Sequence, residues 1–174
     1  MIDRRDFLAL AAAAGSVAVA GPALAQRAPQ PRDSVPMVEL LAEPATKDLW
    51  VGKADAPVTI VEYASLTCSH CATFHEATWP TLKSKYIDTG KVRFVLREFP
   101  LDPVAAAGSM LARCAGDEQG QAVVDLLFAN QSKWLVQKPV DALRDLTKQA
   151  GFTQESFDAC LKNQTLYDAV IKTR

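Results

Sequence analysis

Residues 58–75 read VTIVEYASLTCSHCATFH, and this stretch decides the fold. Its first part, Val58–Tyr63, is a β-branched and aromatic run that predicts a buried strand. From Ser69 to about Tyr86 the apolar side chains recur with helical spacing. The motif Cys68-Ser69-His70-Cys71 therefore lies where a strand gives way to the start of a helix.

A second strand and a block of helices are expected further along the chain. Pro80 should kink the first helix, and Lys91–Phe99 has the composition of a strand. From Pro103 onward the pattern is helical, with Gly151 expected to end one helix and Thr153 to cap the next. The expected helices cover Val104–Ala115, Gln121–Trp134, Val140–Ala150, Phe157–Lys162 and a segment beginning at Leu166.

The first 25 residues have the composition of an export signal. Asp3-Arg4-Arg5-Asp6 precedes an alanine-rich apolar stretch, and Ala23-Leu24-Ala25 supplies the small residues of a cleavage site. We predict a signal peptide over residues 1–25, cleaved after Ala25, with a pattern similar to twin-arginine signals. A membrane anchor is the alternative, but the apolar stretch falls short of the roughly 20 residues that a spanning helix needs.

One folded domain is expected after this signal. Residues 26–48 hold four prolines and little periodicity, which predicts an extended leader with a short helical turn at Met37–Leu41. The domain should then cover residues 49–174. The formal net charge of −1 favours no nucleic-acid partner.

Export changes how the cysteines are interpreted, because disulfides form and persist outside the cytosol. The thiolate is the nucleophile in disulfide exchange, and a helix N-terminus favours a thiolate at Cys68. His70 adds a donor or a positive charge close to the same sulfur. Cys71 lies three residues along and faces the same side of the helix. We predict a redox-active pair in which Cys68 attacks and Cys71 resolves.

The alternatives for this motif are a metal half-site and a plain structural disulfide. A structural zinc site needs four ligands, and His75, one turn after Cys71, could supply a third. No second CxxC motif or paired histidine completes the set. We therefore expect no metal and no cofactor, and we interpret His75 as an ordinary helix residue.

Glu62 interrupts an otherwise apolar strand ahead of the motif. A buried carboxylate is costly, so its presence suggests a role. It could pass a proton to or from Cys71, directly or through water. The alternative is that strand alternation points Glu62 to a wet face. We favour the proton relay.

Two further cysteines, Cys114 and Cys160, fall in the helical block. Left over in an exported protein, they are expected to form a structural disulfide. The alternative is a pair of buried thiols that act as small hydrophobic side chains. A second catalytic pair is not expected, because these residues lack CxxC spacing.

Residues 56–75 closely resemble the DsbA-like branch of the thioredoxin superfamily, as do Arg97–Leu101 and Asp158–Leu161. The resemblance covers about residues 46–174. It implies an α/β thioredoxin-like fold with an all-helical insertion over roughly residues 103–165. It also implies the roles given above for Glu62, Cys68, His70 and Cys71, and Ser69-His70 is similar to the Pro-His dipeptide of oxidising members.

The same resemblance implies a cis-proline loop that faces the CxxC motif, followed by a closing hairpin and helix. The chain ends at Arg174, where that segment should begin, and none of its prolines has the right context. We therefore expect a C-terminally truncated chain that lacks the final hairpin and helix. Such a chain should have an open sheet edge and uncovered apolar surface.

The leading hypothesis is a periplasmic thiol–disulfide oxidoreductase that oxidises exported proteins with free cysteines. The family also implies a membrane redox partner that reoxidises it. A disulfide isomerase or reductase is the alternative within the class. A non-enzymatic metal-binding or chaperone module, using the CxxC motif and His75, is the alternative from another class.

Overall fold

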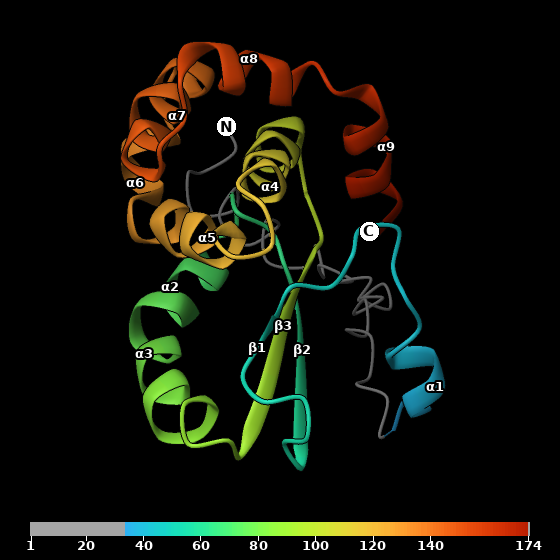
Figure 1. The fold of residues 1–174 in the computed structure, drawn as a ribbon. Coiled ribbons are helices and arrows are strands. Elements are labelled where there is room, and N and C mark those ends of the chain that lie inside the picture. The colour runs from blue at the N-terminus through green and yellow to red at the C-terminus, as the bar shows by residue number, and fades with distance from the viewer. Residues whose placement is uncertain (1–33, 174) are drawn as a thin grey trace, which may run out of the picture. The chain divides into compact units, whose positions relative to one another are not determined.

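The computed structural model describes residues 34–173, drawn in colour in Figure 1. The predicted signal peptide and the first part of the predicted leader, residues 26–33, lie outside this range. The chain divides into two compact units, and the larger one is Leu41–Arg174. The short helix α1, Met37–Leu40, belongs to the smaller unit and lies where a helical turn was predicted.

A three-stranded sheet of order β1-β3-β2 forms the framework of the larger unit. Strands β2, Val58–Ala64, and β3, Val92–Glu98, lie where the two strands were predicted. The prediction that the first of them is buried is wrong, because β2 lies at the edge of the sheet and only its last residue, Ala64, is buried. They pair in parallel, with Val58 opposite Val92. The antiparallel strand β1, Trp50–Val51, was not predicted, because two residues are too few to show a periodic pattern.

The helix after β2 is interrupted near Pro80, as the sequence predicted. Helix α2 covers Ser69–Ala77, α3 covers Trp79–Leu82, and a π-helical turn covers Lys83–Ile87. Pro80 has no backbone N–H to donate to the carbonyl one turn earlier, so the helix is re-initiated at Trp79 with Pro80 in its first turn.

From Pro103 to Leu161 the chain forms a series of helices joined by short loops. Their bounds are α4 Pro103–Cys114, α5 Gly120–Ala129, α6 Gln131–Trp134, α7 Pro139–Thr147, a 3-10 turn at Lys148–Ala150, and α8 Gln154–Leu161. Figure 1 shows α4 to α8 gathered beyond one end of the strands, whereas α2 and α3 run beside them. Helix α9, Gln164–Thr173, returns to contact β3. No helix in the described range is both long and apolar enough to cross a bilayer.

The prediction of one continuous helix over Gln121–Trp134 is wrong. The backbone leaves the helical region at Asn130, with φ −121° and ψ 22°. Side chains take the carbonyls that a continuing helix would have used: the Asn130 amide donates to Leu126 O at 2.8 Å, and Trp134 Nε1 donates to Leu127 O at 2.8 Å. Such side-chain bonds compete with the helical ladder and end α5.

The glycine predicted to end one helix and the threonine predicted to cap the next both have the expected conformations. Gly151 has φ +84°, the left-handed conformation that a glycine adopts without a Cβ penalty after a helix. Thr153 caps α8 through its hydroxyl, which accepts from Ser156 N at 3.1 Å. The chain therefore turns sharply between α7 and α8.

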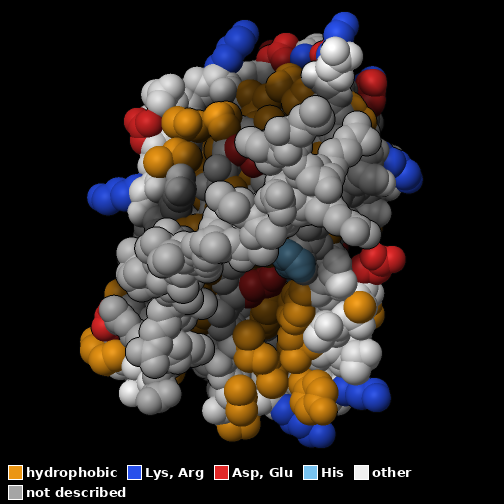
Figure 2. Space-filling model, turned by 180° about the vertical axis from the view of Figure 1, so that it is seen from behind, with side chains coloured by type: hydrophobic (Ala, Val, Ile, Leu, Met, Phe, Trp, Pro, Cys, Tyr) orange, Lys and Arg blue, Asp and Glu red, His pale blue; other side chains and the backbone are white. Residues whose placement is uncertain are grey.

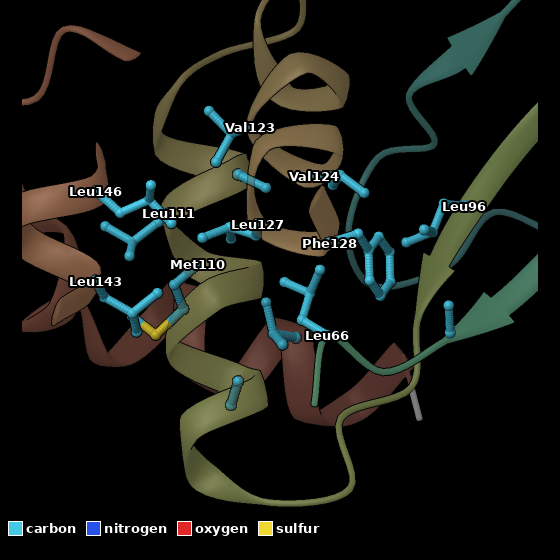
Figure 3. Packing of buried hydrophobic residues seen from close by; sticks show 14 of the residues in the cluster. Leu66, Leu96, Met110, Leu111, Val123, Val124, Leu127, Phe128, Leu143 and Leu146 are labelled. Carbon is cyan, nitrogen blue, oxygen red and sulfur yellow. The ribbon is translucent and has the colours of Figure 1, made fainter. Parts of the chain in front are cut away.

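A hydrophobic cluster joins the sheet to the helical block, and Figure 3 shows part of its packing. Leu66, from the loop after β2, and Phe128, from α5, lie between β3 and the helices. The largest completely buried side chains are Trp134, Phe94, Phe157, Ile87, Leu111, Leu127 and Leu143. Because these come from both the sheet and the helices, the insertion shares one core with the strands.

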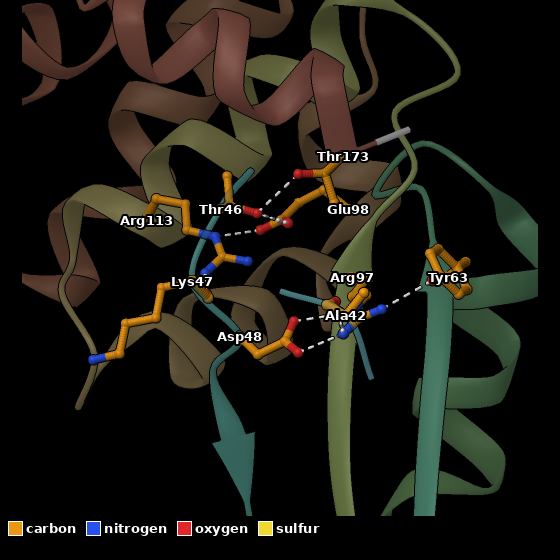
Figure 4. A network of polar contacts seen from close by, with 9 residues as sticks. All are labelled: Ala42, Thr46, Lys47, Asp48, Tyr63, Arg97, Glu98, Arg113 and Thr173. Atoms are coloured by element: carbon orange, nitrogen blue, oxygen red, sulfur yellow. Dashed lines mark hydrogen bonds and ion pairs between the residues drawn. The ribbon is translucent and has the colours of Figure 1, made fainter. Parts of the chain in front are cut away.

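Arg97 of β3 is a buried cation that anchors the segment before β1 (Figure 4). Its guanidinium makes two bonds to the Asp48 carboxylate, Nε to Oδ1 at 3.0 Å and Nη2 to Oδ2 at 2.7 Å. It also donates to Tyr63 Oη at 3.1 Å and to Ala42 O at 3.2 Å. Hydrogen bonding to Asp48 raises the pKa of Arg97, so it stays charged although it is buried.

Glu98, the last residue of β3, ties three further elements together (Figure 4). Its carboxylate accepts from Thr46 Oγ1 at 3.0 Å and forms an ion pair with Arg113 of α4. Thr46 in turn bonds Thr173 of α9, with 3.0 Å between their hydroxyl oxygens. The compact unit therefore includes residues ahead of the domain start at 49 that the sequence predicted.

Strand β2 lies at an edge of the sheet and pairs only with β3 among the described strands. Val58 and Tyr63 of this strand are 50% and 49% exposed. Figure 2 shows hydrophobic side chains at the surface in its lower part, the level at which Figure 1 places the strands. Within residues 34–173, the outer edge of β2 is therefore unpaired and carries exposed apolar side chains.

Candidate active site

Cys68 and Cys71 lie at the junction of the loop after β2 with helix α2. Cys68 is the N-cap residue, with extended backbone angles φ −77° and ψ 119°, and Cys71 lies in the first turn. Both cysteines carry free, partly exposed thiols. The junction predicted from the sequence therefore places two sulfurs at the positive end of a nine-residue helix.

Side chains from two distant helices hold the loop that carries Cys68. Gln131 of α6 donates to Leu66 O at 2.9 Å and to Cys68 O at 3.0 Å. Asp102, the N-cap of α4, accepts from Thr67 Oγ1 at 2.5 Å while its other oxygen caps Ala105 N at 2.8 Å. Sequence reasoning missed both residues, because neither is near the motif in the chain.

The two thiols are in opposite electrostatic situations. The backbone N–H of Cys71, which points at the Cys68 sulfur, lowers the pKa of Cys68 below its ordinary value. The Cys71 thiol and the backbone N–H of His70 act in the same direction, whereas burial and the Glu62 charge oppose them. Burial raises the pKa of Cys71 from 9.0 to about 11. As the pH rises, the thiolate therefore forms first on Cys68.

His70 contributes to this difference through its backbone. Its N–H favours the Cys68 thiolate, and its side chain is exposed to solvent beside the motif. The helix N-terminus is therefore the main source of thiolate stabilisation in this structure, and the imidazole of His70 is free to meet another molecule.

Glu62 is largely buried, with 17% of its side chain exposed, and it accepts a hydrogen bond from His75 Nε2 at 3.0 Å. The wet-face alternative is therefore wrong for this residue. The Glu62 charge raises the pKa of both Cys68 and Cys71, which places the carboxylate within electrostatic reach of both sulfurs.

His75 is more than the ordinary helix residue that the sequence suggested. Its side chain is 3% exposed, and its ring stacks on Phe128 of α5 with centroids 4.2 Å apart. Nδ1 faces the Asp125 carboxylate at 3.7 Å, while Nε2 bonds Glu62. The signal that could have revealed it is spacing: His75 is four residues after Cys71, on the same helix face.

A groove of about 700 Å³ runs beside α2. Helix α2 supplies Ser69 and His75 to its wall, α5 supplies Asp125 and Phe128, and Gln131 comes from α6. The groove therefore begins next to the motif and passes the outer side of the His75 ring.

Within residues 34–173, no group of three or more His, Cys, Asp or Glu side chains is arranged to hold a metal ion. Both ring nitrogens of His75 face carboxylates, so the suggested third ligand is engaged elsewhere.

The remaining cysteines, Cys114 of α4 and Cys160 of α8, are joined by a disulfide with Cα atoms 6.1 Å apart. This bond links two helices of the insertion.

Comparison with known proteins places the chain in a family. The sequence model of a family described as "Thioredoxin" matches residues 45–174 of this chain. A Rickettsia bellii protein named "Putative protein-disulfide oxidoreductase" is 37% identical over 126 residues, which cover 71% of this chain and 49% of that protein. The chain thus spans about half the length of the curated relatives it matches.

Solved structures give the same result. The crystal structure of Wolbachia pipientis α-DsbA1 superposes with a TM-score of 0.70 at 32% identity, covering 76% of this chain and 68% of that one. BdbD from Bacillus subtilis, in its oxidised form, gives a TM-score of 0.52 at 27% identity, with 72% and 71% covered.

The fold and the CxxC site define a thioredoxin-like α/β protein with a helical insertion. The chain belongs to the thioredoxin family and, within that superfamily, to the DsbA-like proteins.

Proposed function

We propose that this chain is a thiol–disulfide oxidoreductase of the periplasm that oxidises exported proteins. One observation carries the proposal. The two thiols lie one helical turn apart, and their pKa values are shifted in opposite directions: that of Cys68 is lowered and that of Cys71 is raised to about 11. Such a pair supplies one sulfur that ionises readily, as a nucleophile or leaving group, and one that holds its proton more tightly.

The oxidising reaction uses the two sulfurs in sequence. A substrate thiolate attacks Cys68 Sγ of the Cys68–Cys71 disulfide, the S–S bond breaks, and Cys71 leaves with the electron pair and takes up a proton. A second substrate thiolate then attacks the substrate sulfur of the mixed disulfide and releases Cys68 as a thiolate. Two electrons pass from the substrate to the enzyme, and the substrate gains a disulfide.

Two other residues have roles in this proposal. The Glu62 side chain, whose charge acts on Cys71, can take a proton from that thiol as a carboxylate and return one as a carboxylic acid. The exposed His70 side chain lies where an incoming substrate would approach Cys68. The substrates are exported proteins with free cysteines, and a membrane protein reoxidises the dithiol.

The proposed periplasmic location is supported by the first 25 residues of the chain. Arg4 and Arg5, the alanine-rich stretch and Ala23-Leu24-Ala25 together support export with cleavage after Ala25. We assign the compact unit that begins at Leu41, ahead of the predicted start at residue 49, to the catalytic domain, with the helical insertion at about 103–165.

Equilibration with glutathione tests both the activity and its direction. The fraction of Cys68–Cys71 disulfide is followed across glutathione ratios, with Cys68→Ser as the inactive control. A potential towards about −120 mV supports an oxidase, and one towards about −270 mV supports the reductase alternative. A wild-type protein that forms no mixed disulfide with glutathione overturns the proposal.

A further inference from the structure

The environment of His75 is more organised than a core histidine requires. Three elements converge on its ring: β2 supplies Glu62, α5 supplies Asp125 and Phe128, and α2 carries His75 itself. Nε2 and Nδ1 point to different carboxylates, at 3.0 Å and 3.7 Å. A buried ring with one carboxylate at each nitrogen is built to carry a positive charge.

The two carboxylates differ in their access to water. The Glu62 side chain is 17% exposed, whereas that of Asp125 is 40% exposed and lines the groove beside α2. Glu76, on α2 itself, is the other acidic group lining that groove. His75 therefore separates a largely buried carboxylate, which acts on both thiols, from a solvent-accessible acidic groove.

We propose that His75 is a positioning residue of the dithiol site: as an imidazolium it holds the Glu62 carboxylate in place and offsets its charge at Cys68 and Cys71. This inference rests on the proposed thiol–disulfide exchange at that pair. His75 touches neither sulfur in this account and acts through Glu62.

The signs of the charges on Glu62 and His75 determine their effect on the two thiols. The Glu62 carboxylate disfavours both thiolates, and a cation 3.0 Å from that carboxylate cancels much of its field. Burial lowers the pKa of His75, but Asp125 and Glu62 more than offset it, so the pKa is raised above 6.5. Without the cation the thiolate of Cys68 is less stable, and the disulfide form becomes a weaker oxidant.

A thermodynamic cycle tests this coupling. The pKa of Cys68 is measured from its ultraviolet thiolate absorbance in the wild type, H75F, E62Q and the double variant E62Q/H75F. His75→Phe keeps a ring for stacking on Phe128 and removes the charge. We expect H75F to lower the thiolate-to-thiol ratio of Cys68 by about tenfold, which is a pKa rise of about one unit. In the E62Q background the same substitution should have little effect.

Two outcomes of this cycle would overturn the proposed role of His75. An equal shift from H75F in both backgrounds, or no shift in either, overturns the inference, because His75 would then act by packing alone. Phe128→Leu is the packing control: it removes the ring stacked on His75 and leaves every charge in place. It should lower the melting temperature without changing the pKa of Cys68.

A measurement on the wild type keeps the inference testable if H75F does not fold. Because coupling between sites is reciprocal, the His75 imidazole should titrate at higher pH in the dithiol form, which carries the Cys68 thiolate, than in the disulfide form. NMR resolves this directly, since the chain has only two histidines. Identical titration in both forms contradicts the coupling.

The two proposals fail in different ways. Loss of the proposed function shows as a wild-type protein that exchanges no disulfide with glutathione. Failure of the role of His75 shows as unchanged coupling in the cycle while the wild type still exchanges normally.

Discussion

Cys68 and Cys71 are the same residue type one helical turn apart, yet their thiols have displaced pKa values of opposite sign. The difference arises from position alone. Cys68 precedes the first turn and receives its unpaired N–H groups, whereas Cys71 lies within the turn and is more buried. The same rule, that position sets the behaviour of a side chain, applies to the buried cation Arg97.

Separate titration of each thiol checks this assignment. In Cys71→Ser, Cys68 should titrate below 9.0, because the backbone N–H of residue 71 is retained. In Cys68→Ser, Cys71 should still titrate above 9.0, because burial is the largest cause of its shift. Thiolate absorbance against pH measures both values. A reversed order would make Cys71 the attacking sulfur.

Arg97→Met should destabilise the protein strongly. The substitution leaves the Asp48 carboxylate, which has 11% of its side chain exposed, without its guanidinium partner. We expect a loss of about 3–5 kcal/mol in the free energy of unfolding, measured in urea. Lys148→Met, which breaks the exposed pair with Asp145, is the matched control and should cost less than about 1 kcal/mol. Equal losses would show that burial of the Arg97 pair is unimportant.

At the scale of elements, the helical block is held by local caps, by the shared core and by one covalent link. Helices α4 and α8 lie far apart in sequence, and the Cys114–Cys160 disulfide joins them across 46 residues. Asp102 and Gln131 connect the same block to the loop of Cys68. The insertion therefore supports the redox site as well as sharing a hydrophobic core with the sheet.

Removal of the disulfide should reduce stability and leave the redox chemistry in place. For Cys114→Ser/Cys160→Ser, the chain-entropy model gives a loss of up to about 4 kcal/mol for a loop of this length. Urea unfolding measures the loss, and glutathione exchange at Cys68 should persist. Because Cys114 is exposed, mild reduction of the wild type should reproduce the effect. Unchanged stability would mean that packing alone holds α8 on α4.

At the scale of the whole molecule, buried charges make stability depend on pH. The folded state raises the pKa of His75 above 6.5, so folding favours its protonated form. The resulting stabilisation is complete below the unfolded-state pKa. It is lost as the pH rises through the folded-state value.

His75→Gln isolates this contribution. The difference in unfolding free energy between the wild type and the variant should be largest below pH 6.5 and should shrink as the pH rises above that value. Urea unfolding at several pH values measures it, and the comparison cancels the carboxylates common to both proteins. A difference that does not change with pH would show that folding leaves the pKa of His75 unchanged, and one that grows with rising pH would show that folding lowers it.

The sequence alone determined what depends on neighbours in the chain. Strand-like composition located β2 and β3, and helical periodicity located most helices. Pro80, Gly151 and Thr153 were placed correctly because their effects are local. The CxxC motif at a strand–helix junction was also visible, since both the junction and the spacing lie within a few residues.

Only the tertiary structure decided what depends on distant contacts. The break at Asn130, the two-residue strand β1 and the bonds from Asp102 and Gln131 come from partners that no local pattern names. The same holds for His75, whose spacing placed it on the helix face of Cys71 but gave no sign of Glu62 and Asp125 on either side. Spacing in the sequence predicts on which face of a helix a side chain lies, whereas tertiary packing decides which charged groups lie next to it.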